Sequence, residues 1–153
     1  MKMIQYAYET CRGDNVLEFQ FPSITRLGQE VVERIVSVAS RYGCDLAEAA
    51  AIRLGVHVAV INAIRHGNGC DPAKMVRVGC HVAENGICVE IEDEGGGFAK
   101  TDVADPTAPE NISKPGGRGL MMMRHHMSSV EYNDAGNQVT MRRQFGAPAA
   151  CLF

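Results

Sequence analysis

Residues 46–66 limit the possible folds most strongly. Their pattern predicts a helix, and this helix is apolar on most of its sides. Asp45, followed three residues later by Glu48, has the pattern of a capping box that opens a helix. Gly67-Asn68-Gly69 can end it, since glycine and asparagine tolerate the left-handed conformation. A helix that is apolar almost all round lies deep in a core or under a ligand. We therefore expect a layered fold built over this helix.

The segment before this helix predicts a strand and a second, amphipathic helix. Residues 16–21 alternate between apolar and polar, and Pro22 has no amide donor with which to continue a strand. Ser23 is positioned to cap a helix over residues 24–42, where apolar side chains recur at helical spacing, and Gly43 is a suitable stop.

Two hairpins and a long loop follow the buried helix. Residues 75–82 and 87–92 alternate and are joined through Asn85-Gly86, a pair that favours a tight turn. Residues 98–115 are rich in proline and aspartate, and we expect them to form a mobile lid, because compact domains seldom keep such a loop without a function. The remaining predicted elements are a helix over residues 120–127 and a hairpin formed by residues 130–132 and 138–141.

This order of elements predicts an α+β fold, a two-layer sandwich with a mixed, mostly antiparallel sheet and its helices on one face. A chain of 153 residues, 46% of them hydrophobic, suits one compact domain. Such a domain buries roughly 70% of the surface that its unfolded chain exposes. We place this domain at residues 16–145, with an N-terminal segment at 1–15 and a tail at 146–153.

Charge and cysteine content exclude several classes of protein. The chain has 15 basic and 18 acidic residues, a net charge of −3, and no block of lysine or arginine of the kind that binds nucleic acid or membrane surfaces. We find no stretch approaching the ~18 apolar residues that would span a bilayer, and no export signal. The six cysteines are scattered, without a C-x-x-C pair, so we expect reduced thiols in a cytoplasmic protein; Cys80 and Cys88 flank one turn and could be neighbours in the sheet.

The buried helix also carries the first candidate site residues. Val58, Asn62 and His66 are spaced by four, so their side chains project from nearly the same side. The side-chain oxygen of Asn62 suits a Mg²⁺ ion that bridges nucleotide phosphates. The alternative is that Asn62 only caps a break in a buried helix.

Two glycine motifs downstream favour the nucleotide interpretation. Asp93 follows a strand, and Gly95 and Gly97 leave room for a flat ligand, so the Asp93 carboxylate can accept a hydrogen bond from an adenine amino group. Residues 116–119, Gly-Gly-Arg-Gly, open a helix whose N-terminal amides can bind phosphate. Each motif alone is weak, but the three together predict one nucleotide pocket.

This set of motifs resembles the Bergerat ATP-binding fold shared by gyrase, Hsp90, sensor histidine kinases and DNA mismatch-repair ATPases. More narrowly, the chain resembles the bacterial anti-sigma-factor serine/threonine kinases over about residues 16–145. The motifs that carry the narrower resemblance are Asn62-Ala63-Ile64-Arg65-His66-Gly67-Asn68, Asp105-Pro106-Thr107-Ala108-Pro109-Glu110-Asn111, Gly117-Arg118-Gly119-Leu120 and Gly136-Asn137-Gln138-Val139-Thr140-Met141.

The resemblance implies a regulator that binds ATP or ADP with Mg²⁺, binds a sigma factor or another regulator, and phosphorylates a serine on a STAS-type antagonist. It also implies a homodimer. Carried over by position, Asn62 would bind the metal and Asp93 the adenine. The other nucleotide-binding positions would be Gly95, Gly97, Gly117, Arg118 and Gly119, with Thr140 near the adenine end and Lys114 a weaker candidate.

One position departs from the pattern of the family. Members that turn over ATP carry a glutamate four residues before the asparagine, and this chain has Val58 there. A valine side chain cannot act as a base, and loss of a general base typically costs ~10²–10⁴ in rate. Two other residues could be considered as substitutes for the missing base. His57 projects about 100° away from the Asn62 side of the helix, and Glu94, in the turn after Asp93, is expected to face solvent.

We therefore expect an ATP-binding regulator with impaired catalysis and no catalytic residue at position 58. Two alternatives remain open. One is a slow serine/threonine kinase that uses another base, and the other is a detached ATPase domain of a sensor histidine kinase. The second is disfavoured, since no phospho-acceptor hairpin precedes the strand at Val16.

Overall fold

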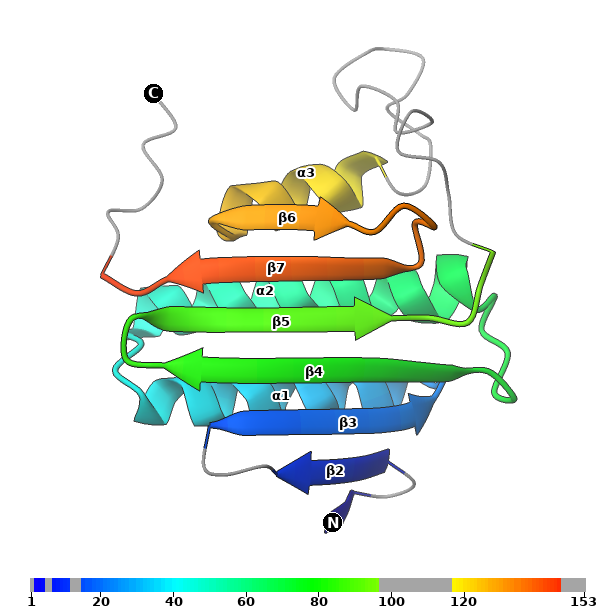
Figure 1. The fold of residues 1–153 in the computed structure, drawn as a ribbon, viewed down its shortest axis with the longest axis horizontal. Helices are drawn as coiled ribbons and strands as arrows, with labels where there is room; N and C mark the ends of the chain where they lie inside the picture. Colours follow the sequence, from blue (N-terminus) through cyan, green and yellow to red (C-terminus); the bar gives the residue numbers. More distant parts are fainter. Residues whose placement is uncertain (1, 5–6, 12–14, 97–116, 147–153) are drawn as a thin grey trace.

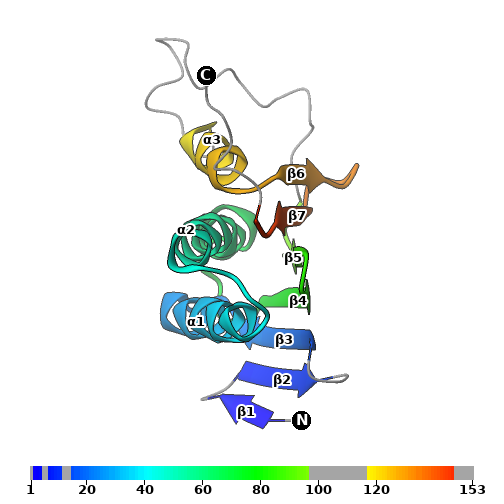
Figure 2. The same ribbon diagram turned by 90° about the vertical axis from the view of Figure 1, so that its left-hand side faces the viewer.

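The computed structural model describes residues 2–4, 7–11, 15–96 and 117–146, with side chains from residue 15 onward. Seen edge-on, it has two layers, a sheet on one side and the helices on the other (Figure 2). The strands are β1 Lys2–Ile4, β2 Ala7–Cys11, β3 Val16–Pro22, β4 Met75–Ala83, β5 Gly86–Glu92, β6 Ser129–Tyr132 and β7 Gln138–Gln144. The helices are α1 Thr25–Arg41, α2 Leu46–Asn62, the π-helical turn η1 Ala63–Gly67 and α3 Gly117–His126. The predicted α+β fold with helices on one face is confirmed.

The described strands form one seven-stranded sheet in the order β1-β2-β3-β4-β5-β7-β6 (Figure 1). Each described pair is antiparallel, which corrects the expectation of a mixed sheet. The reason is that α1 and α2 run in opposite directions, so together they return the chain to the end of the sheet at which β3 stopped. β1 and β2 lie in the segment expected to precede the domain, and they extend the sheet beyond β3.

The start of α1 differs from the prediction. The N-cap position is Ile24, which supplies no side-chain hydrogen bond, so Ser23 is not the cap. Ser23 Oγ instead donates to the carbonyl of Lys74, 2.7 Å away, and so joins this end of α1 to the residue before β4. The predicted stop is correct, because Gly43 follows the helix with a φ of 94° that glycine adopts readily.

The predicted capping box opens α2. The Glu48 amide donates to Asp45 Oδ1 at 2.7 Å, and the Asp45 amide donates to Glu48 Oε1 at 3.2 Å. The other end of this helix differs from the prediction. After Asn62 the α-helix changes to the wider turn η1, which is closed by a hydrogen bond of 2.9 Å from the Asn68 amide to the Ala63 carbonyl. Such π-turns are frequent at functional sites.

The helix of residues 46–67 is long and apolar enough, by length and composition alone, to cross a membrane, which corrects the expectation from the sequence. More than half of its most apolar 18-residue stretch is buried inside the protein. Ile52, Val56 and Val60 are fully buried between the sheet and the flanking helices, so the core accounts for this apolar character.

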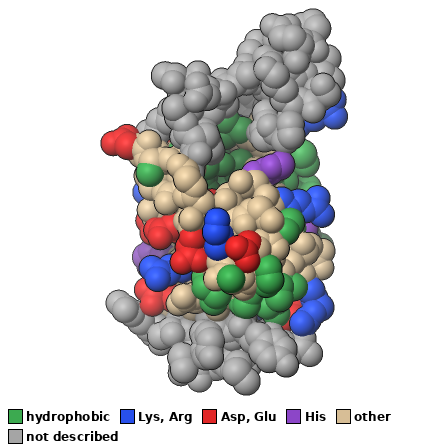
Figure 3. All heavy atoms as spheres, turned by 90° about the vertical axis from the view of Figure 1, so that its right-hand side faces the viewer, with side chains coloured by type: hydrophobic (Ala, Val, Ile, Leu, Met, Phe, Trp, Pro, Cys, Tyr) green, Lys and Arg blue, Asp and Glu red, His purple; other side chains and the backbone are tan. Residues whose placement is uncertain are grey.

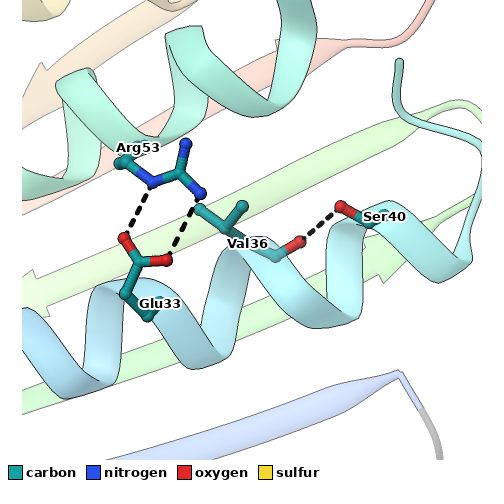
Figure 4. Close-up of polar contacts among 4 residues, drawn as sticks. All are labelled: Glu33, Val36, Ser40 and Arg53. Carbon is teal, nitrogen blue, oxygen red and sulfur yellow. Dashed lines mark hydrogen bonds and ion pairs between the residues drawn. The ribbon is translucent and has the colours of Figure 1, made fainter. Parts of the chain in front are cut away.

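α1 and α2 pack closely at Gly28. A Cβ atom placed on Gly28 would lie 2.7 Å from Val60 Cγ1 and 2.9 Å from Ile64 Cδ1. On the outer side, the Arg53 guanidinium of α2 donates to the Glu33 carboxylate of α1 at 2.7 and 3.3 Å (Figure 4). Both side chains are about half exposed, so this ion pair adds at most about 1 kcal/mol.

The first hairpin forms as predicted, but with a different turn. Ala83 pairs with Gly86, so the loop residues are Glu84 and Asn85, and Gly86 already belongs to β5. Glycine is needed at position 86 for another reason, since a Cβ there would lie 2.6 Å from the Arg143 carbonyl of β7.

Cys80 and Cys88 do not face each other. Cys88 pairs with His81 rather than with Cys80, and Cys80 is buried under the helices whereas Cys88 has the opposite orientation. Alternate residues of a strand point to opposite faces, so the sheet separates the two thiols.

Candidate functional site

The start of α3 rests directly on the predicted stripe of α2. A Cβ atom placed on Gly119 would lie 2.8 Å from Asn62 Nδ2 and 3.2 Å from Val58 Cγ1. The glycine is therefore needed for this close approach. Gly117 and Arg118 form the same first turn of α3, with the Arg118 side chain exposed. The structure thus brings the Gly117-Arg118-Gly119 motif into contact with the stripe of α2 that carries Val58 and Asn62.

The second motif lies at the same end of the sheet, where β5 ends. The Asp93 amide donates to the Asn137 carbonyl at 2.9 Å, and the Asp93 carboxylate accepts the Gly95 amide at 2.8 Å. Gly67, the last residue of η1, lies so close that a methyl group there would overlap the carboxylate of Asp93. Gly95 similarly lies against the Gly67 carbonyl, which leaves no room for a side chain at position 95.

Figure 3 views the molecule from this end and shows acidic side chains gathered next to a basic one near the centre of the face. The main influence on Asp93 is partial burial, which raises its pKa. The Gly95 amide and the charge of Lys74 lower this pKa, and the charge of Glu92 raises it. Asp93 is therefore a half-buried acceptor whose second oxygen is directed toward Gly67.

Tyr132 was missed by the sequence analysis. Its partners in the sheet place it on the same face as Val139, beneath the helices, and it packs against the core. Burial first, and the charge of Asp93 second, raise the pKa of Tyr132 to about 12. The phenol therefore lies within the electrostatic reach of Asp93, although no motif in the sequence marks it.

Asn68 was also not predicted as a site residue, because Gly67-Asn68-Gly69 is typical of a helix stop. It is 2% exposed and its side chain makes hydrogen bonds to Ser23, Met75 and Glu94. Left-handed conformations occur instead at Gly69 and Cys70. An asparagine between two glycines does not by itself distinguish a helix stop from a buried bridge.

Thr140 is not brought to the site. In β7 the buried residues are Val139 and Met141, so Thr140 points to the opposite face of the sheet. Its cross-strand neighbours there are Glu90 and Glu131. The expectation that Thr140 lies near the adenine end is therefore corrected by the register of β7.

Three further candidates have different outcomes. Glu94 has a structural hydrogen bond, since its carboxylate accepts the Met75 amide at 2.5 Å. Gly97 and Lys114, together with the predicted lid, lie outside the described residues.

The described residues fit a phosphate-bound metal better than a metal held by protein alone. Within residues 15–96 and 118–146, no cluster of three or more His, Cys, Asp or Glu could hold an ion. The Asn62 side-chain amide makes no cap hydrogen bond at η1 and lies at the α3 N-terminus, beside Gly119. A single amide oxygen beside helix N-terminal amides suits an ion that keeps water and phosphate oxygens as its other ligands.

Comparison with known proteins agrees with this geometry. Residues 21–143 match the family described as the histidine kinase-like ATPase domain, and the chain belongs to that family. Nucleotide binding is the property that this class of domain implies.

Among the relatives, the chain is 33% identical over 100 residues to the anti-sigma F factor of Clostridium perfringens (strain 13 / Type A), covering 61% of this chain and 70% of that protein. It is 30% identical over 134 residues to the anti-sigma F factor of Pasteuria penetrans, covering 83% and 87%. It is 28% identical over 134 residues to that of Heyndrickxia coagulans, covering 84% and 90%. Within its family, the chain is therefore an anti-sigma regulatory member.

Proposed function

We propose that this chain is a cytoplasmic regulator that binds ATP or ADP and acts by binding partner proteins, with little or no phosphotransfer of its own. The observation that carries the proposal is the contact of Gly119 with both Asn62 and Val58. This contact places the N-terminus of α3, which suits phosphate, next to the Asn62 amide, which suits Mg²⁺. It also places both next to Val58, which cannot act as a base.

Each site residue has a role in this proposal. The Asp93 carboxylate accepts a hydrogen bond from the adenine amino group. Gly95, packed against the Gly67 carbonyl, holds that carboxylate through its amide, and Gly97 leaves room for the base. The amides of Gly117 and Gly119, with the Arg118 guanidinium, face the phosphates. Asn62 supplies an oxygen ligand to Mg²⁺, which, when bound, neutralises phosphate charge.

Impaired catalysis follows from the apolar side chain of Val58. The attacking hydroxyl or water needs a group that accepts its proton, and valine has no lone pair. Glu94 is a poor substitute because its carboxylate is engaged by the Met75 amide. The alternative, a slow serine/threonine kinase, would require a base from elsewhere.

The partners are proposed from the relatives, which are named anti-sigma F factors. We infer that this chain binds a sigma factor, a STAS-type antagonist or both, and that it forms a homodimer. A serine on the antagonist is the acceptor in the alternative in which the chain is a slow kinase.

Val58→Glu tests the catalytic part of the proposal, with Val58→Gln as the control of similar size that lacks a base. ATP turnover is measured as ADP formed by each purified variant. For a site adapted to regulation, we expect Val58→Glu to stay within about threefold of Val58→Gln, since a base alone does not restore the other parts of a catalytic site. A gain of ~10²-fold or more, the scale of a restored general base, would instead favour the slow kinase.

A further inference from the structure

Asn68 is a buried side chain that uses both ends of its amide. Nδ2 donates to Ser23 Oγ at 2.8 Å and to the Met75 carbonyl at 3.0 Å. Oδ1 accepts the backbone amide of Glu94 at 2.8 Å. With 2% of its surface exposed, Asn68 cannot exchange these partners for water, so loss of any of them leaves a buried polar group unpaired.

The three partners come from three separate parts of the fold. Ser23 precedes α1 and is bonded in turn to the Lys74 carbonyl, and Met75 is the first residue of β4. Glu94 belongs to the turn after β5, and its own carboxylate accepts the Met75 amide. Asn68 therefore links the end of the buried helix to the ends of the central strands β4 and β5, at the turn that carries Asp93.

The two ends of the amide have different consequences. Nδ2 joins Ser23, which precedes α1, to Met75, the first residue of β4. Oδ1 holds the amide that directly follows Asp93 in the chain, while the Asp93 amide is held by Asn137 and its carboxylate accepts Gly95. The turn is thus anchored on both sides of Asp93, and Asn68 provides the anchor on the side of the glycine motif.

We propose that Asn68 is a positioning residue for base recognition: through the Glu94 amide it fixes the direction of the Asp93 carboxylate, and with it the preference for a base that carries an exocyclic amino group. This inference rests on the proposed function, because it requires nucleotide to bind at Asp93. It goes further by assigning the specificity to a buried residue that does not touch the ligand.

The test compares ATP with purine riboside triphosphate, which is ATP without the exocyclic amino group. Both are titrated calorimetrically into the wild-type chain, Asn68→Ala, Asn68→Asp and Ser23→Ala, with folding checked by circular dichroism. We expect the wild-type preference for ATP to fall by about tenfold in Asn68→Ala, because a misdirected carboxylate loses its bond to the amino group but not the phosphate contacts.

The other two variants separate positioning from stability. Ser23→Ala removes one partner of Nδ2 and leaves Oδ1 in place, so it should unfold more easily while keeping the ratio of the two affinities within about twofold. Asn68→Asp keeps an acceptor for the Glu94 amide and should also keep the ratio, at a cost in stability. If Asn68→Ala does not fold, Asn68→Asp decides the question, since loss of the ratio there contradicts the proposal.

Failure of this inference differs from failure of the proposed function. If wild-type protein binds ATP and Asn68→Ala weakens both nucleotides equally, Asn68 has only a structural role. If the wild-type chain does not bind ATP at all, the nucleotide-binding function itself is wrong, and this inference falls with it.

Discussion

At the scale of single residues, glycines determine how closely the backbones of the site approach one another. Gly67 and Gly95 allow the end of the buried helix to pack onto Asp93, and Gly119 allows α3 to rest on Asn62. None of these glycines has a positive φ, so space rather than backbone conformation requires them.

Gly67→Ala tests this account of the site. Its methyl group would overlap the Asp93 carboxylate and push it out of place. We expect ATP affinity, measured by calorimetry, to fall about tenfold or more, a loss comparable to that of one hydrogen bond to a charged group.

Gly96→Ala is the matched control, because a Cβ at position 96 meets no atom of the described residues within 4 Å. It should bind ATP as the wild-type chain does. Equal affinities for Gly67→Ala and wild type would show that the Asp93 carboxylate is not the recognition group.

The sequence predicted the residues with recognisable motif spacing better than those that act through burial. Val58, Asn62 and Gly119 meet in the structure as one constellation. Thr140 was misplaced because which face it occupies depends on the register of β7, and a shift of one residue reverses the face. Asn68 and Tyr132 were missed because their partners are distant in the sequence.

At the scale of elements, α2 joins the core to the site. Its residue Gly55 faces α3, and near its end Val60 packs against Gly28 of α1 while Val58 and Asn62 face Gly119. Helix ends with local signals were predictable, such as the capping box at Asp45 and Glu48. The π-turn was not predicted: it is closed by a bond between residues five apart, from the Asn68 amide to the Ala63 carbonyl, and no motif in the sequence marks it.

Gly28→Ala and Gly55→Ala test the packing of α2, since each replaces a helical glycine and gains similar helix propensity. At Gly28 the new methyl group meets the stiff, fully buried Val60, whereas at Gly55 it meets the flexible Met127 at 3.0 Å. We expect urea denaturation to show Gly28→Ala less stable than Gly55→Ala by about 1–3 kcal/mol, the usual cost of overpacking. Equal free energies of unfolding for the two variants would mean that the α1–α2 contact accommodates an added methyl group as well as the α2–α3 contact does.

At the scale of the whole molecule, one face of the sheet is covered by helices and titratable groups are buried beneath them. Burial raises the pKa of Cys80 to about 12 and that of Tyr132 to about 12. Both groups are neutral when folded, and unfolding exposes groups that ionise more easily. Their contribution to stability is therefore complete below pH 9, the usual pKa of a thiol, and is lost as pH rises toward 12.

Cys80→Val tests this alkaline sensitivity. Between pH 8 and pH 11, about the range in which exposed thiols ionise, the wild-type free energy of unfolding should fall more steeply than that of the variant. Cys88→Val is the control, because Cys88 lies on the other face of the sheet and is only partly buried. Parallel pH profiles for wild type and Cys80→Val would contradict the assignment.

The overall architecture was largely predictable, since two hairpins and two helices with clear periodicity leave few ways to form layers. β1, β2 and the uniformly antiparallel pairing were not predicted, because short edge strands carry little pattern and strand direction depends on how the helices return the chain.

A calorimetric titration of the purified chain with ATP and with ADP, with and without Mg²⁺, tests whether Asp93 lies in a nucleotide site. Asp93→Asn removes the proposed adenine acceptor, and Thr140→Val is the control on the opposite face of the sheet. We predict saturable binding by the wild-type chain and by Thr140→Val, and its loss in Asp93→Asn. No binding by the wild-type chain, or equal binding by Asp93→Asn, would contradict a nucleotide site at Asp93.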